Sequence, residues 1–336
     1  MSEKVVIGNK RTLAPPKTCL LTVSNTCHLK CKMCDLWQKD TAHEEISIEE
    51  CKHFINALGE FEGEPLELHL IGGETFIKKD IFDLIRHART RNSRVVVTTS
   101  GYAITPEVAK EIGRSGLNML NFSIESLQAQ THDYLRGVGG IHKKVMEAIE
   151  HVAHFAPETE MAINTIITKK NIHDVVALTK WVDDNKRLSQ IYFMAVMRPF
   201  GSDLDLDWYD TERAQILWPD NYSEVETVLS ELSAMKRSGV HIGNSCGQLE
   251  VFKAYFRDPR NFVKRTGCNL DEHALNVNAI GDVYLCFFIE KIGNIRQSSP
   301  RDLWFSDKAE EVREKMKGCC RNCELVVNCY YEDESQ

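Results

Sequence analysis

Short apolar runs rich in β-branched residues alternate along the first two-thirds of the chain with longer stretches whose apolar residues recur at helical spacing. Each pair predicts a strand followed by the helix that returns the chain to the same sheet. Six such units follow one another. The predicted strands span residues 19–24, 66–71, 94–99, 118–124, 160–168 and 190–197, and the helices span 48–58, 80–89, 106–114, 141–155, 172–185 and 222–237.

This order predicts a parallel sheet with right-handed crossovers, arranged either as an open doubly wound sheet or as a partial barrel. In both arrangements ligands bind at the carboxyl ends of the strands. After about Gly239 the rhythm stops, and short segments with aromatic residues and spaced cysteines follow. We therefore expect an N-terminal arm (1–16), a core (17–238) and a small cysteine-rich domain (239–336).

Composition and charge exclude several classes of function. Hydrophobic residues make up 43% of the chain and charged residues 27%, which is typical of a globular protein. The net charge is −8, and positive and negative residues are interspersed along the chain. The chain has no run of basic residues long enough to form a nucleic-acid-binding patch, so a nucleic-acid partner is not expected. No signal peptide and no membrane-length apolar run is evident, which predicts a soluble, cytoplasmic protein. In that compartment, twelve cysteines favour metal or redox sites over disulfides.

Three of the cysteines, Cys27, Cys31 and Cys34, share the loop after the first predicted strand. Thiolates are the usual ligands of iron–sulfur clusters, whereas a closed structural zinc site needs four ligands. His28 follows Cys27 directly and is poorly placed to reach the same metal. Three cysteines on one short loop suit three corners of a cubane and leave the fourth iron open. The alternative is a zinc knuckle with a distant fourth ligand.

This CxxxCxxC loop resembles the signature of the radical S-adenosylmethionine (SAM) superfamily. Ile71-Gly72-Gly73-Glu74, after the second strand, resembles that family's GGE motif. The resemblance covers roughly two-thirds of the chain and implies a partial (β/α)6 TIM-type barrel. Its remaining motifs follow in the family's order: Thr98-Thr99-Ser100-Gly101, Ser123-Ile124-Glu125-Ser126, Leu135-Arg136-Gly137, Asn164 and Met197-Arg198-Pro199.

The resemblance implies that Cys27, Cys31 and Cys34 hold a [4Fe–4S] cluster whose open iron binds SAM. One electron from the cluster then cleaves SAM to a 5′-deoxyadenosyl radical, which abstracts hydrogen from a substrate. A reductant such as flavodoxin or ferredoxin is the implied partner. The cofactor-binding candidates are Gly72 and Gly73 for close backbone approach, Glu74 for the methionyl ammonium, Ser123 for a ribose or carboxylate oxygen, Arg136 for the SAM carboxylate, Met197 for adenine, and Met33, which replaces the family's usual aromatic residue near adenine.

Residues of the second predicted strand alternate between the two faces of the sheet. Its leucines are expected to pack on the outer helices, which directs Glu67 and His69 into the barrel lumen. His69 is therefore the lumen candidate for a catalytic residue. The alternative is that Glu67 and His69 only satisfy each other.

A second set of cysteines lies in the C-terminal third, where Cys286 follows Gly281 in a predicted hairpin strand. The order resembles the SPASM and twitch auxiliary-cluster domains. Because no cysteine follows Cys329, the resemblance implies one auxiliary [4Fe–4S] cluster; a structural zinc site is the alternative. The ligand candidates are Cys268 and Cys286 with two later cysteines, of which Cys320 and Cys323 are preferred, Cys329 is a rival and Cys319 is least favoured.

The implied activity is hydrogen abstraction by a radical SAM enzyme of oxidoreductase type, with net dehydrogenation if the auxiliary cluster accepts an electron from the substrate radical. Only 26 residues precede Cys27, too few for a leader-binding domain. This favours a small-molecule substrate, with sugars among the candidates. Modification of a ribosomally made peptide is the alternative. A non-catalytic iron–sulfur electron carrier or sensor is the alternative from another class, against which the GGE and strand-end motifs argue.

Overall fold

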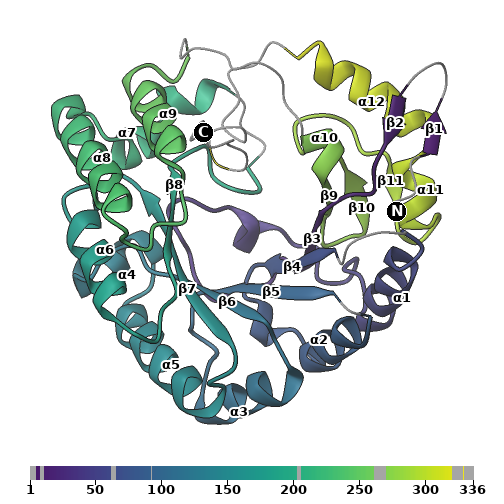
Figure 1. The fold of residues 1–336 in the computed structure, drawn as a ribbon, viewed down its shortest axis with the longest axis horizontal. Coiled ribbons are helices and arrows are strands. Elements are labelled where there is room, and N and C mark those ends of the chain that lie inside the picture. Colours follow the sequence, from purple (N-terminus) through teal and green to yellow (C-terminus); the bar gives the residue numbers. More distant parts are fainter. Residues whose placement is uncertain are drawn as a thin grey trace.

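A curved sheet of nine strands runs through the molecule (Figure 1). The computed structural model describes residues 5–7, 11–61, 66–91, 93–202, 206–260, 270–319 and 328. Six parallel strands, paired in chain order, form the main part of the sheet. They are β3 (Thr18–Ser24), β4 (Glu67–Gly72), β5 (Arg94–Thr99), β6 (Met119–Ser123), β7 (Glu160–Ile167) and β8 (Ile191–Ala195).

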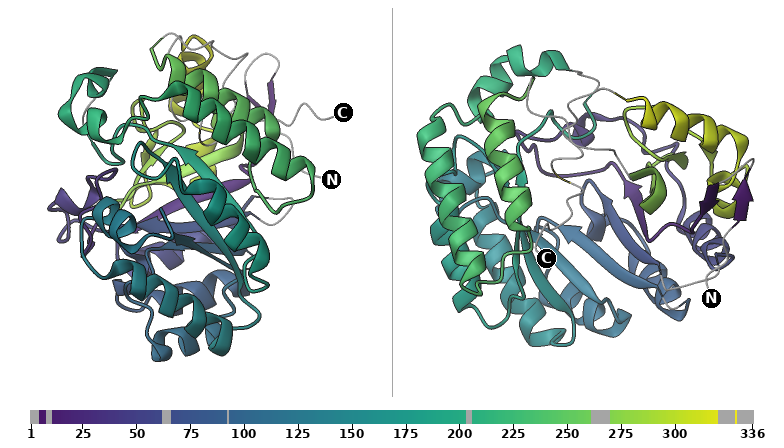
Figure 2. Two further views of the ribbon diagram at one scale, coloured as in Figure 1. Left: turned by 90° about the vertical axis from the view of Figure 1, so that its left-hand side faces the viewer. Right: turned by 45° about the horizontal axis from the view of Figure 1, so that its top comes forward.

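Crossover helices lie along the outer side of this curved sheet (Figures 1 and 2). Their apolar faces and the outward side chains of the strands form one core, in which Leu68, Leu70 and Phe122 have no exposed surface. The predicted partial (β/α)6 barrel is therefore confirmed. The helices are α1 (Ile48–Leu58), α2 (Ile81–Thr90), α3 (Pro106–Ser115), α5 (Ile141–Phe155), α6 (Val175–Asp184) and α8 (Tyr222–Arg237).

Local side-chain chemistry explains where several helices begin. Ser47 and Glu50 form a reciprocal capping box at the start of α1. Thr105 caps α3, whose first residue is Pro106, a residue suited to the first helical turn. The helix α6 begins three residues later than predicted, because Asn171 accepts hydrogen bonds from the backbone and hydroxyl of Thr168 and holds this segment in a turn.

The C-terminal part continues the sheet instead of standing apart from it. Strand β9 (Ala274–Val277) pairs in parallel with β3, and β10 (Asp282–Tyr284) and β11 (Gly293–Asn294) follow in antiparallel order. The hairpin strand predicted after Gly281 corresponds to β10, whereas the pairing of β9 with β3 was not predicted. Two helices complete this part: α11 (Pro300–Trp304) and α12 (Asp307–Lys317).

The domain boundary expected after residue 238 stays a prediction. Beyond that residue, residues 241–244 still form hydrogen bonds with β8. Among the described residues, no helix is long and apolar enough to cross a membrane. The remaining described elements connect or flank these layers: β1 (Val5–Ile7), β2 (Arg11–Leu13), η1 (Leu36–Gln38), η2 (Thr75–Ile77), α4 (Ala129–Arg136), η3 (Leu206–Asp210), α7 (Glu212–Leu217), α9 (Cys246–Arg257) and α10 (Leu270–His273).

Candidate cluster site and substrate cavity

The loop that follows β3 presents Cys27, Cys31 and Cys34 as free thiols. Burial raises the pKa of Cys27 to about 11 and that of Cys34 to about 12, so iron binding must displace their protons. Among the described residues, no three His, Cys, Asp or Glu side chains are placed to hold a single metal ion. A cubane takes its thiolates on separate irons, so three thiols spaced along one loop fit such a cluster.

The GGE segment is joined to the start of this loop by backbone hydrogen bonds. Gly73 N donates to Ser24 O at 2.8 Å, and Glu74 N donates to Thr26 O at 3.0 Å. A Cβ on Gly72 or Gly73 would lie well under 3.0 Å from the carbonyl oxygens of Ser24 and Thr26. The close approach that requires glycine here is thus to the cysteine loop, while contact of the glycines with SAM stays a prediction.

Glu74 is almost completely buried and orders the loop that follows β5. Its carboxylate accepts hydrogen bonds from the Thr99 hydroxyl at 2.7 Å, from Ser100 N at 3.0 Å and from the Ser100 hydroxyl. A carboxylate has about four acceptor positions. Phe76 N adds a fourth, longer contact at 3.5 Å, so these four donors already take up about that number of positions, and contact of Glu74 with the methionyl ammonium stays a prediction.

The Leu135-Arg136-Gly137 motif holds a second side of the cysteine loop. Lys32 N donates to Leu135 O at 2.8 Å, and Gly137, at a φ of 73°, leaves no space for a Cβ beside Lys30. Arg136 was predicted to bind the SAM carboxylate. In the structure its guanidinium forms an ion pair with the fully buried Glu125, and one nitrogen lies 3.8 Å from Cys31 Sγ. The protein thus already supplies a carboxylate partner, and contact with SAM stays a prediction.

A third side of the loop is bound by the segment after β8 and by α7. Phe200 N donates to Met33 O at 3.2 Å, and Asp35 N donates to Phe200 O at 2.8 Å. Met33 and Ser123 are buried, whereas Met197 lines a cavity beside the loop. Arg213, which sequence reasoning missed, reaches the backbone of the loop from α7.

His69 pairs with its neighbour on the same strand, Glu67. Its Nε2 lies 2.6 Å from Glu67 Oε1, and Glu67 also pairs with Arg94 at 3.1 Å. These contacts hold the pKa of Glu67 below its usual range, with the His69 hydrogen bond as the main cause. They agree with the structural alternative for His69, and a catalytic role is a prediction without support from these contacts.

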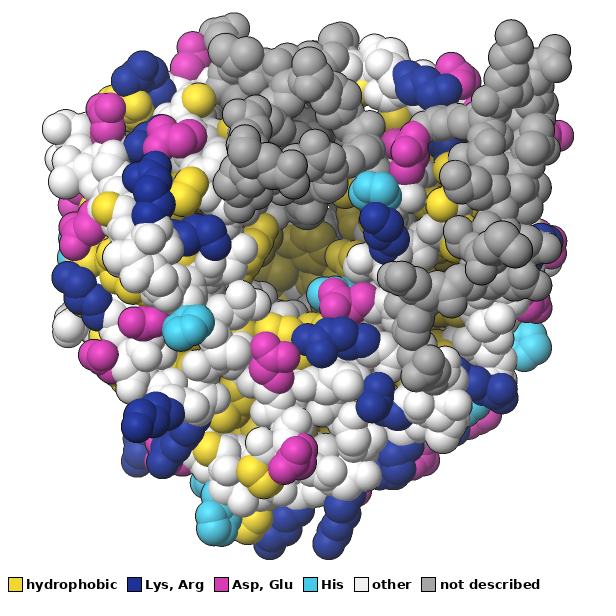
Figure 3. Space-filling view, viewed as in Figure 1, with side chains coloured by type: hydrophobic (Ala, Val, Ile, Leu, Met, Phe, Trp, Pro, Cys, Tyr) yellow, Lys and Arg dark blue, Asp and Glu magenta, His cyan; other side chains and the backbone are white. Residues whose placement is uncertain are grey.

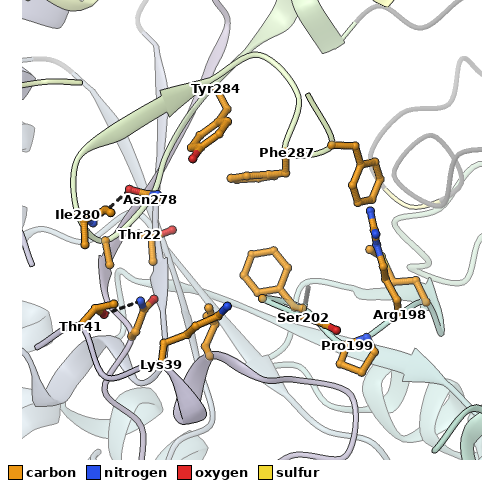
Figure 4. Close-up of a pocket in the computed structure, with 17 residues that line it drawn as sticks. Thr22, Lys39, Thr41, Arg198, Pro199, Ser202, Asn278, Ile280, Tyr284 and Phe287 are labelled. Atoms are coloured by element: carbon orange, nitrogen blue, oxygen red, sulfur yellow. Dashed lines mark hydrogen bonds between the residues drawn. The ribbon is translucent and has the colours of Figure 1, made fainter. Parts of the chain in front are cut away.

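A cavity of about 620 Å³ lies between the cysteine-loop side and the C-terminal hairpin (Figure 4). Tyr284 and Phe287 project into it from the hairpin, Lys39 from the opposite side, and Arg198 stacks on Phe288 at 3.6 Å. Figure 3 shows the molecule hollowed near its centre, with hydrophobic side chains on the wall of the hollow. The cavity lining comprises Thr22, Asn25, Leu36, Lys39, Thr41, Met197, Arg198, Pro199, Phe200, Gly201, Ser202, Asn278, Ala279, Ile280, Tyr284, Phe287 and Phe288.

Of the predicted auxiliary ligands, the structure describes Cys286 and Cys319. Cys286 is buried just after β10, and its Sγ accepts a hydrogen bond from Phe288 N at 3.4 Å. It therefore lies next to two aromatic residues of the cavity wall. Cys319 is half-buried beyond α12. The other candidates, Cys268, Cys320, Cys323 and Cys329, lie outside the described residues, so the composition of the auxiliary site stays a prediction.

Three thiols lie on the loop at the carboxyl end of the first strand of an incomplete parallel barrel. Leu36, just beyond Cys34, and residues of a cysteine-bearing extension line a cavity near this loop. This arrangement is typical of an iron–sulfur protein with a ligand site at the strand ends. The chain belongs to the radical SAM superfamily. Residues 21–182 match that superfamily, and residues 268–324 match the SPASM iron–sulfur cluster-binding domain. SAM and [4Fe–4S] clusters are accordingly its cofactors, and the chain is an enzyme of this superfamily.

Two curated relatives are similar over most of their length. The AdoMet-dependent heme synthase of Methanosarcina barkeri is 27% identical, with 90% of this chain and 87% of that protein covered. Mycofactocin maturase MftC of Mycolicibacterium smegmatis is 25% identical, with 94% and 77% covered.

Two solved structures share the fold. Streptococcus suis SuiB bound to S-adenosylmethionine has a TM-score of 0.67 at 15% identity, with 89% of this chain and 68% of that chain covered. The enzyme anSMEcpe with bound AdoMet and Cp18Cys peptide has a TM-score of 0.66 at 18% identity, with 94% and 88% covered.

Proposed function

We propose that this radical SAM enzyme dehydrogenates a residue of a ribosomally made peptide. Cys27, Cys31 and Cys34 would hold the SAM-binding cluster, and Cys286 would contribute to the auxiliary one. When bound, SAM and these clusters would supply hydrogen-atom abstraction and an acceptor for one electron, so that the residue would lose one hydrogen atom, one electron and one proton, the proton going to solvent. The observation that carries the proposal is the position of the cavity. Met197, a predicted adenine contact, lines it, and so do Phe287 and Phe288, which directly follow the predicted auxiliary ligand Cys286.

The cavity suits a peptide segment in size and chemistry. Its volume of about 620 Å³ lies within the usual range of ligand pockets. Tyr284 and Phe287 offer apolar rings for a side chain, and Thr22 and Asn278 offer groups that can bond to a peptide backbone. A separate partner that binds the leader of the peptide would complete the system, with flavodoxin or ferredoxin as the reductant.

The comparisons support the peptide better than a sugar-like small molecule. The relatives include mycofactocin maturase MftC and PqqA peptide cyclase, the second of which is 26% identical over 49% of this chain. The peptide, first stated as the alternative, is therefore preferred here to the expected small-molecule substrate.

A second candidate, oxidation of a heme precursor, is favoured by a specific observation. The similarity to AdoMet-dependent heme synthase spans nine-tenths of the chain. The cavity also carries two neighbouring rings, Tyr284 and Phe287, 5.8 Å apart, and the Arg198 guanidinium on Phe288. Flat aromatic surfaces with a nearby cation suit a planar macrocycle that bears carboxylates.

The test is anaerobic turnover of the reconstituted enzyme with SAM and dithionite. The substrates are peptides encoded by short reading frames beside the gene and, separately, iron coproporphyrin III. Mass spectrometry of a peptide that has lost H₂, together with 5′-deoxyadenosine, is the expected result. Conversion of the porphyrin alone would establish the second candidate. Release of 5′-deoxyadenosine with neither substrate altered would contradict both.

A further inference from the structure

Arg213 makes four contacts with the cysteine loop, although about 180 residues separate it from that loop. Its Nε donates to Lys32 O. Its Nη2 donates to Cys34 O at 3.1 Å and approaches Cys31 O at 3.4 Å. Its Nη1 donates to the Asp35 carboxylate at 2.6 Å. The planar guanidinium thus holds the carbonyl groups of Cys31 and Cys34, two predicted cluster ligands, and of Lys32, one of the two residues between them.

The base of Arg213 is itself held in place. Thr211 caps α7 by accepting from Ala214 N at 3.2 Å, and its hydroxyl donates to Trp208 O at 2.6 Å. Trp208 and Leu217 are completely buried. The guanidinium therefore extends from an anchored segment, and its contacts depend on packing of this segment against the core.

Within the stretch from Cys31 to Cys34, Arg213 contacts backbone carbonyl oxygens and not the thiol groups. The three thiols must keep a fixed spacing to bind three irons of one cubane, and this spacing depends on the backbone between Cys31 and Cys34. The nearby Asp35 carboxylate balances much of the positive charge of Arg213. Its main effect on the cluster is therefore expected to be geometric, with a smaller electrostatic contribution.

We propose that Arg213 is a positioning residue for the SAM-binding cluster, which fixes the backbone from Cys31 to Cys34 and so preserves the geometry of its three thiolate ligands. Asp35 assists by orienting the guanidinium. This role concerns the shared SAM chemistry of the superfamily and is independent of the substrate proposed above.

The experiment compares Arg213→Gln, Arg213→Lys and Asp35→Asn with the wild-type holoenzyme. Arg187→Gln is the control, because Arg187 pairs with Glu150 far along the chain from the loop. The readouts are the rate of iron loss to a chelator and the change that SAM causes in the electron paramagnetic resonance (EPR) spectrum of the reduced cluster. A Cys27→Ala/Cys31→Ala/Cys34→Ala variant supplies the signal of the auxiliary cluster alone.

Arg213→Gln should lose the SAM-site iron on the order of tenfold faster than wild type, the effect of losing charged hydrogen bonds. It should also weaken the spectral response to SAM, while the auxiliary signal persists. Arg213→Lys should retain iron better than Arg213→Gln, since lysine keeps the positive charge but lacks the forked guanidinium. The rate of iron loss from Asp35→Asn should lie between those of wild type and Arg213→Gln. Wild-type iron retention and SAM response in Arg213→Gln would overturn the proposal. If circular dichroism shows that this variant misfolds, wild-type behaviour of Arg213→Lys and Asp35→Asn together would overturn it.

Discussion

The side-chain amide of Asn328 pairs with the backbone of Ala195 in both directions. Ala195 N donates to Asn328 Oδ1 at 2.8 Å, and Asn328 Nδ2 donates to Ala195 O at 2.9 Å. Asn244 does the same for Phe193, at 2.7 and 2.8 Å. Because β8 is the last strand of the sheet, two asparagine side chains here satisfy edge groups that would otherwise lack a partner.

Asn328→Ala should therefore destabilise the barrel. It leaves the N–H and C=O of Ala195 unpaired at a buried edge, at a cost of about 1–3 kcal/mol for each group that water does not reach. Urea unfolding measures the change in the free energy of unfolding. Asn56→Ala, at an exposed position that contacts His87, is the control and should change it little. Equal stabilities of the two variants would show that the pairing contributes nothing.

Replacing a glycine of the GGE segment should disturb the cysteine loop before any ligand binds. In Gly73→Ala the new Cβ would overlap Thr26 O and Asn25 O, so the loop must move. We expect a loss of about 1–3 kcal/mol of stability, typical of overpacking, together with reduced iron at the SAM site.

The matched control is Gly139→Ala, since nothing lies within 4 Å of a Cβ at that position. It should keep wild-type stability and iron content, as measured by urea unfolding and iron assay. If Gly73→Ala unfolded like wild type and failed only to bind SAM, the glycine would serve the ligand rather than the loop.

The sequence predicted the elements whose signals are local. The predicted bounds of α1, β5 and α5 match the structure, because a capping box, a β-branched run and helical periodicity are each contained within the element. The three cysteines were likewise recognisable from their spacing alone.

Long-range contacts were not predictable in this way. The four residues of β9 pair with β3, about 250 residues earlier, and such a short segment carries no sign of its partner. Arg213 occupies a short helix whose sequence gives no indication that it contacts the cysteine loop. The ion pair of Arg136 with the buried Glu125 of the Ser123-Ile124-Glu125-Ser126 motif was also not predicted, and contact of Arg136 with SAM stays a prediction.

The protein should become less stable as the pH is lowered, partly because of His132. This side chain is completely buried. Glu125 N donates to its Nδ1 at 3.1 Å, and its Nε2 has no hydrogen-bond partner within the described part of the chain. Burial is the main cause that lowers the pKa of His132 to about 2, with Arg136 and His142 adding to it. In the unfolded chain the pKa of this histidine is about 6.5, so at pH values between about 6.5 and 2 the side chain is protonated in the unfolded chain and neutral in the folded protein. Stability contributed by neutral His132 is therefore complete above about pH 6.5 and declines below it, by up to about 1.4 kcal/mol per pH unit.

Urea unfolding of wild type and His132→Asn at pH 7 and pH 5 measures this decline. Asparagine keeps an acceptor for Glu125 N but does not titrate, so the variant should lose less stability between the two pH values than wild type. His43→Asn, at an exposed position, should retain the wild-type dependence. A His132→Asn curve parallel to wild type would assign the acid sensitivity to other groups.

The two cluster sites should be separable by single cysteine substitutions. Cys31→Ala should abolish the SAM-site signal and 5′-deoxyadenosine formation while the auxiliary signal remains, because Cys31 lies on the loop after β3, whereas Cys286 follows β10 in the C-terminal part. Cys286→Ala should abolish the auxiliary signal while the SAM-site signal remains. The control is Cys51→Ala, which removes a buried thiol of α1 that belongs to neither predicted set. EPR spectra of the reduced variants with and without SAM distinguish the signals, and equal loss of both clusters in Cys31→Ala would contradict the assignment of two independent sites.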